Sequence, residues 1–275
     1  MENLDPNTVD GFGREWARFD QSEIDEATLK RVFEQYFAIF PWETLPKDAV
    51  GADIGVGSGR WARFVAPRVG HLHCVDASEQ ALGVARQTLS GRDNVTFHAT
   101  SVGALPFAEG SLDFCYSLGV LHHVPDTAEA IAACARALKP GAPLLLYLYY
   151  RFDNRPAWFR QLWEVSDAGR RVVSRLPHSL RHAVTDAIAA GVYFPLARIA
   201  QKLERLGLDV SLVPLSAYRD KSFYTMRTDA LDRFGTQLEQ RFTRDEIVKM
   251  MTDAGLERIR VGDDFPFWCA VGYRR

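Results

Sequence analysis

The chain has 275 residues, of which 47% are hydrophobic and 25% charged, as in ordinary soluble globular proteins. Its length suits one large α/β domain or one domain with an elaboration. Its formal net charge of -2 gives no general attraction to polyanions, so no nucleic-acid partner is expected. The four cysteines form no CxxC pair and have no His or Cys at zinc-ligand spacing. We therefore expect buried thiols, without disulfides and without a metal site.

The N-terminal residues 1–47 are expected to form a helical lid segment. The first residues lack the basic and apolar regions of a targeting signal, which favours a cytoplasmic protein. Aromatic residues at helical spacing follow, and such a segment either covers a ligand or packs on a sheet. Phe12 and Trp16 are the residues that we expect at a ligand.

Residues 48–150 alternate short apolar runs with helical segments, which is typical of a parallel sheet with helices on both faces. A helix is predicted over 126–137, because Pro140 and Gly141 end it. The predicted strands are 49–54, 71–75, 95–99, 112–118 and 143–150.

Residues 151–240 interrupt this alternation and predict an inserted helical cap. Aromatic residues at helical spacing are followed by an apolar helical stretch over 183–206, which we expect Pro195 to break. Residues 151–182 hold seven arginines and three acidic residues, a net charge of +4. This charge indicates either a solvated surface or, through 151–206, weak contact with a membrane surface or lipid.

Residues 241–275 are expected to complete the sheet. Thr243 and Glu246 have the spacing of a capping box before an apolar helix, which Gly255 ends. Two strands are predicted after it, 256–261 and 267–273, as a hairpin at one sheet edge.

A glycine loop follows the first predicted strand, with Gly55, Gly57 and Gly59 in strict alternation. This spacing differs from the G-x-G-x-x-G pattern that binds the pyrophosphate of a dinucleotide. Asp53 precedes the loop, where a carboxylate would repel phosphate but accept hydrogen bonds from an amino group. Asp76 ends the next strand, where an acid can bind ribose hydroxyls. A nucleoside without phosphate, carrying an amino group, therefore fits best.

Four motifs in this order give the chain a resemblance to a known family. Together they resemble class I S-adenosylmethionine-dependent methyltransferases, in the small-molecule branch that includes quinone and natural-product enzymes. The resemblance implies a Rossmann-like, seven-stranded, mostly parallel α/β sheet of order 3-2-1-4-5-7-6, with a helical insertion after the fifth strand. The motifs are Asp53-Ile-Gly-Val-Gly-Ser-Gly59, Val75-Asp76-Ala-Ser78, Ala104-Leu-Pro-Phe107 and Ser117-Leu-Gly-Val-Leu-His-His-Val-Pro-Asp126.

The resemblance implies S-adenosylmethionine as cofactor, bound at the carboxyl edge of the sheet. Relatives often place an acid five residues before the proline of the Leu-Pro-Phe motif, and Ser101 stands there in this chain. A serine or a backbone amide can still hydrogen-bond an adenine ring. The residues expected at the cofactor are Asp53, Gly55, Gly57, Gly59, Arg60, Asp76, Ala77, Ser101, Val102, Leu118, His123 and Trp16.

A second set of residues is expected at the methyl acceptor. His122 and His123 follow the fourth strand, where an imidazole either acts as a base toward a hydroxyl or only shapes the loop at the cofactor. Six residues near the fifth strand and in the insertion are expected to contact the substrate or to serve as aromatic packing: Tyr147, Tyr149, Arg151, Tyr218, Arg219 and Tyr224.

These observations predict an enzyme that methylates an O, an N or a carbon of a small molecule, such as a natural product, a sugar or a lipid-like ring. One alternative is a non-catalytic protein that binds S-adenosylmethionine as a partner or regulator. A nicotinamide-dependent oxidoreductase is the other, and the alternating glycines and Asp53 oppose it.

Overall fold

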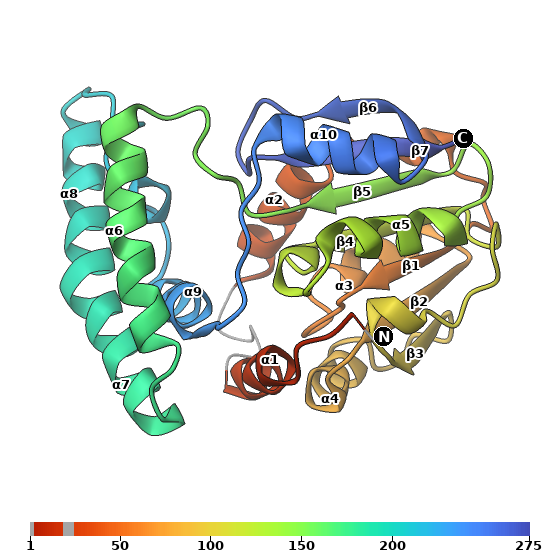
Figure 1. Ribbon diagram of the computed structural model, residues 1–275, viewed down its shortest axis with the longest axis horizontal. Coiled ribbons are helices and arrows are strands. Elements are labelled where there is room, and N and C mark those ends of the chain that lie inside the picture. Colours follow the sequence, from red (N-terminus) through yellow and green to blue (C-terminus); the bar gives the residue numbers. More distant parts are fainter. Residues whose placement is uncertain (1–2, 19–24) are drawn as a thin grey trace. The chain divides into compact units, whose positions relative to one another are not determined.

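The computed structural model describes residues 3–18 and 25–275. The chain divides into two compact units (Figure 1). The first, here called the sheet unit, comprises Met1–Arg151 and Leu238–Arg275. The second, the helical unit, comprises Phe152–Gln237.

The sheet unit is built on seven strands in the order β3-β2-β1-β4-β5-β7-β6. Neighbouring strands are parallel from β3 to β5, and β7 is antiparallel to both β5 and β6. The predicted Rossmann-like class and strand order are therefore confirmed. The strands are β1 Val50–Ile54, β2 His71–Asp76, β3 Val95–Ala99, β4 Phe114–Leu118, β5 Pro143–Tyr147, β6 Leu256–Val261 and β7 Cys269–Arg274.

Helices cover both faces of this sheet (Figure 1). One apolar core joins the sheet to α5 and α10, and a second joins it to α2, α3 and α4. The predicted capping box is present, with Thr243 and Glu246 each bonding the other's backbone N–H. The helices are α1 Pro6–Arg18, α2 Glu26–Tyr36, α3 Ala62–Val65, α4 Glu79–Thr88, α5 Thr127–Ala137 and α10 Arg244–Asp253. All four cysteines are free and buried.

The fifth strand is shorter than predicted, since β5 ends at Tyr147 rather than at residue 150. Its partner β7 begins at Cys269, directly opposite Tyr147, so no ladder remains for the following residues. Tyr150 instead forms an isolated bridge with Phe242, and the Phe242 N–H donates to the Tyr149 carbonyl. A returning segment thus takes the place of the missing ladder.

The helical unit contains α6 Ala157–Val173, α7 His178–Ile188, α8 Phe194–Arg205 and α9 Phe223–Gly235. The prediction that Pro195 breaks the helix was wrong, because a π-helical segment, Ala189–Tyr193, carries α7 directly into α8. Pro195 is the second residue of α8, directly after that wider segment. A small core of Ala189, Tyr193, Ala197, Met226 and Ala230 holds the unit together.

Candidate functional site

The glycine loop follows β1 and has no space for a side chain at Gly55 or Gly57. Gly55 has φ +80°, and a Cβ there would overlap the Val120 side chain. Gly57 has φ +54°, and its Cβ would lie 3.0 Å from the indole of Trp16. Positive φ and close neighbours both require glycine at these two positions. The loop therefore presents bare backbone at the carboxyl end of the sheet.

Asp76 connects this loop to the next helix. Its Oδ2 accepts a hydrogen bond from the Gly57 N–H and its Oδ1 accepts one from the Ser78 N–H, each 2.9 Å long. Ser78 in turn caps α4 by accepting from the Ala81 N–H. Burial raises the pKa of Asp76, against the lowering effect of the hydrogen bonds from Ser78 and Gly57. The acid expected at a ribose thus also organises the loop.

Asp53 lies in β1 and is 2% exposed. The Tyr116 hydroxyl, from the neighbouring strand β4, donates to its Oδ2 at 2.8 Å. The pKa of Asp53 is raised to about 7. Burial is the main cause, the nearby charge of Asp76 adds to it, and the Tyr116 hydrogen bond acts in the opposite direction. A cation placed beside this buried carboxyl would favour its ionised form and lower its pKa.

Helix α1 brings aromatic residues to the carboxyl ends of β1 and β4. Trp16 lies against Gly57, and the Arg60 guanidinium lies 5.2 Å from the centre of the Trp16 ring. Phe12 contacts His123, with ring centroids 4.8 Å apart. Trp16, Arg60 and His123, all expected at the cofactor, therefore border one region of the sheet unit, while the lid function of α1 stays a prediction.

The other residues expected at the cofactor end neighbouring strands. Ala77 lies between Asp76 and the capping Ser78, after β2. Ser101 and Val102 are buried after β3, at the start of a short 3-10 helix. Leu118 ends β4 and is buried. The parallel order of these strands brings all four positions to the edge that carries the glycine loop.

The two histidines differ in their surroundings. His122 is fully buried and stacks on Tyr149, with ring centroids 3.9 Å apart. Burial, and then the charges of His123 and Arg241, hold the pKa of His122 well below its ordinary value. His123 Nδ1 lies 2.7 Å from the Leu238 carbonyl, which can only accept, so Nδ1 is the donor and Nε2 the basic nitrogen. Of the pair, His123 is the better placed to accept a proton.

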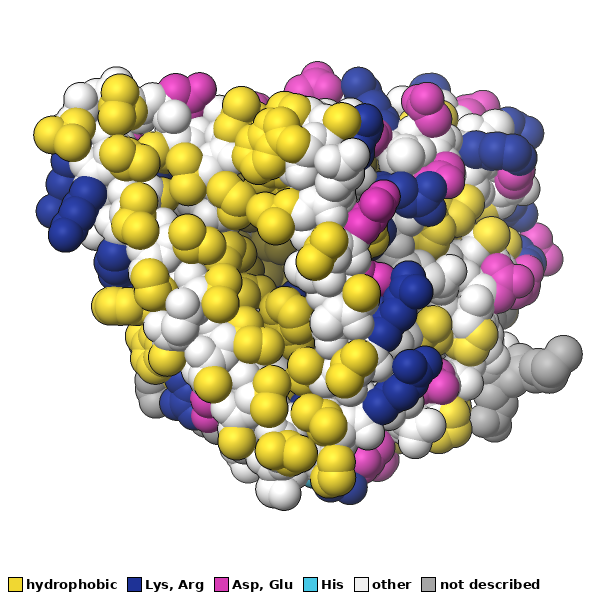
Figure 2. Space-filling view, turned by 60° about the vertical axis from the view of Figure 1, so that its left-hand side comes forward, with side chains coloured by type: hydrophobic (Ala, Val, Ile, Leu, Met, Phe, Trp, Pro, Cys, Tyr) yellow, Lys and Arg dark blue, Asp and Glu magenta, His cyan; other side chains and the backbone are white. Residues whose placement is uncertain are grey.

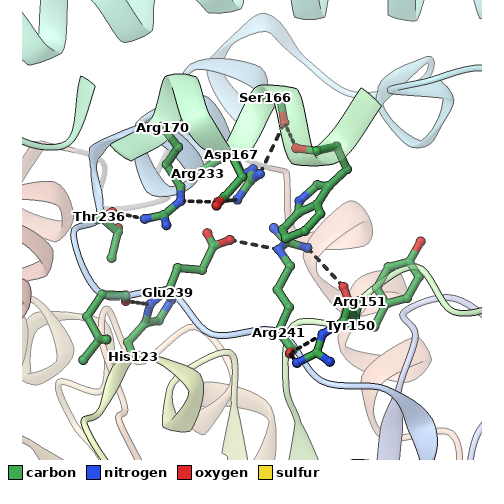
Figure 3. A network of polar contacts seen from close by, with 12 residues as sticks. His123, Tyr150, Arg151, Ser166, Asp167, Arg170, Arg233, Thr236, Glu239 and Arg241 are labelled. Carbon is green, nitrogen blue, oxygen red and sulfur yellow. Dashed lines mark hydrogen bonds and ion pairs between the residues drawn. The ribbon is translucent and has the colours of Figure 1, made fainter. Parts of the chain in front are cut away.

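A charged segment that the sequence analysis missed lies beside these histidines (Figure 3). The Gln240 backbone N–H donates to the His122 carbonyl, and the Gln240 side-chain amide donates to the Val124 carbonyl. Glu239 and Arg241 form an ion pair 2.9 Å long, with side chains only 1% and 10% exposed. The Arg241 guanidinium lies 4.9 Å from the centre of the Tyr149 ring. In the sequence, Glu239 and Arg241 are visible only as charged residues shortly before the Thr243 capping box. They match no motif that would indicate a functional site.

The residues expected at the acceptor belong to both units. Tyr147 and Tyr149 lie near the histidines, and Tyr147 packs edge-on against Tyr36. Arg151 is exposed, and its guanidinium donates to Glu246 and to the Arg241 carbonyl.

The other three expected acceptor residues belong to the helical unit. Tyr218 packs on Tyr193 there, and Arg219 pairs with Glu204 at 2.7 Å. Tyr224 lies in α9 and is half-buried. Their contact with a substrate stays a prediction.

The family model of a methyltransferase domain matches residues 52–146. Phosphoethanolamine N-methyltransferase 2 of Caenorhabditis elegans is 35% identical over 100 residues, which cover 35% of this chain and 23% of the relative. A ubiquinone biosynthesis O-methyltransferase of Hahella chejuensis is 40% identical over 94 residues, which cover 34% of this chain and 40% of the relative. The chain thus spans less than half the length of these curated relatives.

A solved S-adenosylmethionine-dependent methyltransferase of Methanosarcina mazei shares the fold, with a TM-score of 0.52 and 18% identity. The match covers 86% of this chain and 98% of that protein. The sheet order, the glycine loop with its two acids and the family match agree. Residues 52–146 thus match a methyltransferase domain in sequence, and the sheet unit that contains them has the fold of a solved S-adenosylmethionine-dependent methyltransferase.

Proposed function

We propose that this protein transfers a methyl group from S-adenosylmethionine to an oxygen, nitrogen or carbon of a small molecule. One observation carries the proposal. Within the matched domain, the glycine loop is hydrogen-bonded to Asp76 and follows the buried Asp53. The relatives named above are an N-methyltransferase and an O-methyltransferase, so both acceptor atoms are candidates. A cytoplasmic location remains part of this proposal.

The residues present suit such a cofactor, which would supply a methyl carbon activated by a sulfonium. Asp53 would face its ammonium group. Burial raises the pKa of Asp53, and the positive charge of the ammonium would favour the ionised carboxylate. Asp76 would bind the ribose hydroxyls with the carboxylate that also holds Gly57. Ala77 and Val102 would border the adenine, and Ser101 would offer it a polar group in place of the acid of relatives.

Transfer from a sulfonium requires the acceptor atom to be aligned with the methyl carbon. Holding reactants in such geometry supplies roughly 7–11 kcal/mol. Tyr147 and Tyr149 would form an aromatic wall for the acceptor next to the histidines. His123 Nε2 would remove a proton where the acceptor is a hydroxyl, and we retain residues 151–240 as the proposed acceptor cap.

The test is acceptor-dependent formation of S-adenosylhomocysteine. The purified full chain is incubated with methyl-labelled S-adenosylmethionine and small hydroxyl- or amine-bearing acceptors, including hydroxylated quinone precursors and ethanolamine phosphates. We expect label in an acceptor and equal release of S-adenosylhomocysteine. Binding of NADH without binding of S-adenosylmethionine would instead indicate the oxidoreductase alternative. Cofactor binding without turnover on any acceptor would favour the non-catalytic one.

A second prediction separates the roles of the two histidines. His123→Ala is expected to lower kcat on a hydroxyl acceptor about 100-fold, in the range of general-base catalysis, with the Kd for S-adenosylhomocysteine changed less than about threefold. His122→Phe preserves a stacked ring on Tyr149 and is expected to keep most activity. Steady-state kinetics and calorimetry measure both quantities. Equal losses in kcat and affinity for His123→Ala would make it a cofactor-binding residue only.

A further inference from the structure

Helix α6 of the helical unit buries its polar side (Figure 3). Asp167 and Arg170 are both buried, and they form an ion pair 2.7 Å long. Arg233 of α9 lies 3.7 Å from the same Asp167 carboxylate. Arg170 also donates to the backbone carbonyls of Thr236 and Gln237. The contacts with Arg233, Thr236 and Gln237 join α6 to α9 and the residues after it, so they fix the rotation of α6 within the helical unit.

The opposite side of α6 is apolar and exposed. Trp158, Leu162, Val165 and Val172 are spaced by four, three and seven residues, which places them on one stripe of the helix. The exposed fraction is 48% for Trp158 and 72% for Val165. A surface helix of a globular protein normally shows the reverse arrangement. The polar anchors of α6 therefore hold an apolar stripe outward.

A second apolar stripe runs along the helix formed by α7, the π-helical segment and α8. Between residues 183 and 199 every exposed position is uncharged. Leu180, Val192, Ile199 and Leu206 are all at least 45% exposed. By length and composition His178–Arg205 could cross a membrane, but only 28% of its most apolar window is buried, so it is not an ordinary core helix.

Contacts on its inner side indicate that this helix lies on the unit instead of crossing a membrane alone. Asp186 pairs with Arg227 of α9 at 2.9 Å. Arg198 donates to the carbonyls of Arg219 and Lys221. The helix also packs its small residues against α9 through the core of the unit. Only its outer side is available, as in helices that lie in the plane of a membrane surface.

These two stripes, here called the apolar face, belong to neighbouring helices, because α6 contacts α7 and α7 continues into α8. Figure 2 turns the α6 and α8 side forward and shows hydrophobic side chains crowded there with few charged ones among them. Of the thirteen exposed large hydrophobic residues among the described ones, twelve belong to the helical unit. The apolar face comprises Trp158, Leu162, Val165, Val172, Leu180, Val192, Ile199 and Leu206.

Charge decides between the partners that an apolar surface can take. The helical unit holds 13 Lys and Arg against 9 Asp and Glu, a net charge of +4, while the rest of the chain carries -6. Exposed basic residues accompany the helices of the apolar face, namely Arg160, Arg171, Arg175, Lys202 and Arg205. A second copy of this unit would bring like charge to like charge. An anionic lipid surface is complementary, because its negative charge attracts basic residues near it.

We propose that the apolar face docks the protein on an anionic lipid bilayer. The apolar stripes enter the boundary between headgroups and acyl chains, and the basic residues contact the lipid phosphates. This docking needs no methyl transfer and no bound cofactor, so it stands independently of the proposed enzymatic function. It would bring the domain to acceptors that dissolve in lipid.

The experiment is co-sedimentation of the full chain with phosphatidylcholine vesicles, with and without phosphatidylglycerol. We expect at least about tenfold stronger partition onto the anionic vesicles, weakened by salt. Val165→Glu combined with Ile199→Glu is expected to reduce binding about tenfold or more, because each change replaces a buried apolar contact with the lipid by a negative charge. Both residues are exposed, so the fold should persist. The matched control is Phe265→Glu, an exposed apolar residue of the sheet unit.

A charge arm uses Arg160→Gln with Arg205→Gln, which should reduce binding to anionic vesicles and its salt dependence. Arg92→Gln, an exposed arginine of the sheet unit, is the control and should have no effect. Equal binding by the face variants and Phe265→Glu, or no vesicle binding, would overturn the proposal. So would a dimer in analytical ultracentrifugation that Val165→Glu dissociates. Calorimetry with S-adenosylhomocysteine on the same variants reports on the cofactor site separately.

Discussion

Asp53→Asn is expected to make the protein without cofactor more stable at pH 8 while weakening cofactor binding. The folded pKa of about 7 lies above the ordinary value of 3.8, so the folded state favours the protonated carboxyl. The protonated carboxyl therefore makes its full contribution to the free energy of unfolding below about pH 4, and this contribution is lost as the pH rises through 7. At one pKa unit per 1.36 kcal/mol, the loss reaches roughly 4 kcal/mol. Asparagine stays neutral and can still accept the Tyr116 hydroxyl.

Urea unfolding of the wild type and of Asp53→Asn at pH 5 and pH 8 measures this effect. The gain in free energy of unfolding should be larger at pH 8. Asp113→Asn is the matched control, because Asp113 accepts from the Val50 N–H at the other end of β1 and pairs with Lys139. That variant should lose stability. A gain for Asp53→Asn that is independent of pH, or no gain, would contradict the assigned cause.

The same variant should bind S-adenosylmethionine more weakly, because a neutral amide no longer attracts the ammonium group. Hydrogen bonds to charged groups contribute about 1.5–3 kcal/mol, which corresponds to a loss of roughly tenfold to a hundredfold. Calorimetric titration at pH 8 measures it. An unchanged Kd would place Asp53 outside the cofactor site and leave it a buried acid without this role.

Asp76→Asn is expected to have the largest effect on the cofactor, raising the Kd for S-adenosylhomocysteine by a few hundredfold. The amide turns one NH2 group toward a backbone N–H, so either the Gly57 or the Ser78 hydrogen bond is lost. The charge that would bind the ribose hydroxyls is lost as well. Two interactions at the lower end of the range of about 1.5–3 kcal/mol give this magnitude.

Isothermal titration calorimetry with S-adenosylhomocysteine tests this prediction, and far-UV circular dichroism verifies the fold. Glu79→Gln, at the next acidic position in the chain, is the control and should bind within about twofold of wild type. Glu79 is exposed and pairs with Arg86 on the surface, where such pairs contribute about 0–1 kcal/mol. Folded Asp76→Asn protein with unchanged affinity would remove Asp76 from the proposed site.

Much of the fold was predictable because its signals are local. The strands at 95–99 and 256–261 were predicted at their observed bounds, since each lies between clear turn residues. The Thr243 capping box and the glycine loop depend on neighbouring residues only. Strand ends that depend on a partner, such as the end of β5, were missed because β7 decides where the ladder stops.

The site divides in the same way. Asp53, Asp76 and the glycines were found from their spacing, but the Tyr116 hydroxyl is separated from Asp53 by 63 positions in the sequence. Glu239, Gln240 and Arg241 carry no motif, and only folding brings them to His122 and Tyr149. Hydrophobic periodicity relates residues that are near neighbours in the sequence, so it does not predict contacts of this kind.

By itself, the sequence determined the class of sheet, the loop that requires glycine and the two acids beside it, because backbone conformation and strand patterning are set by near neighbours. Only the tertiary structure decided that Asp53 is buried enough to approach a pKa of 7 and that α6 turns its apolar stripe outward. Burial depends on which distant segments pack on a side chain. The Asp167–Arg170 pair lies within α6, but the pair of Asp167 with Arg233 joins α6 to α9 and forms only when both helices are in place.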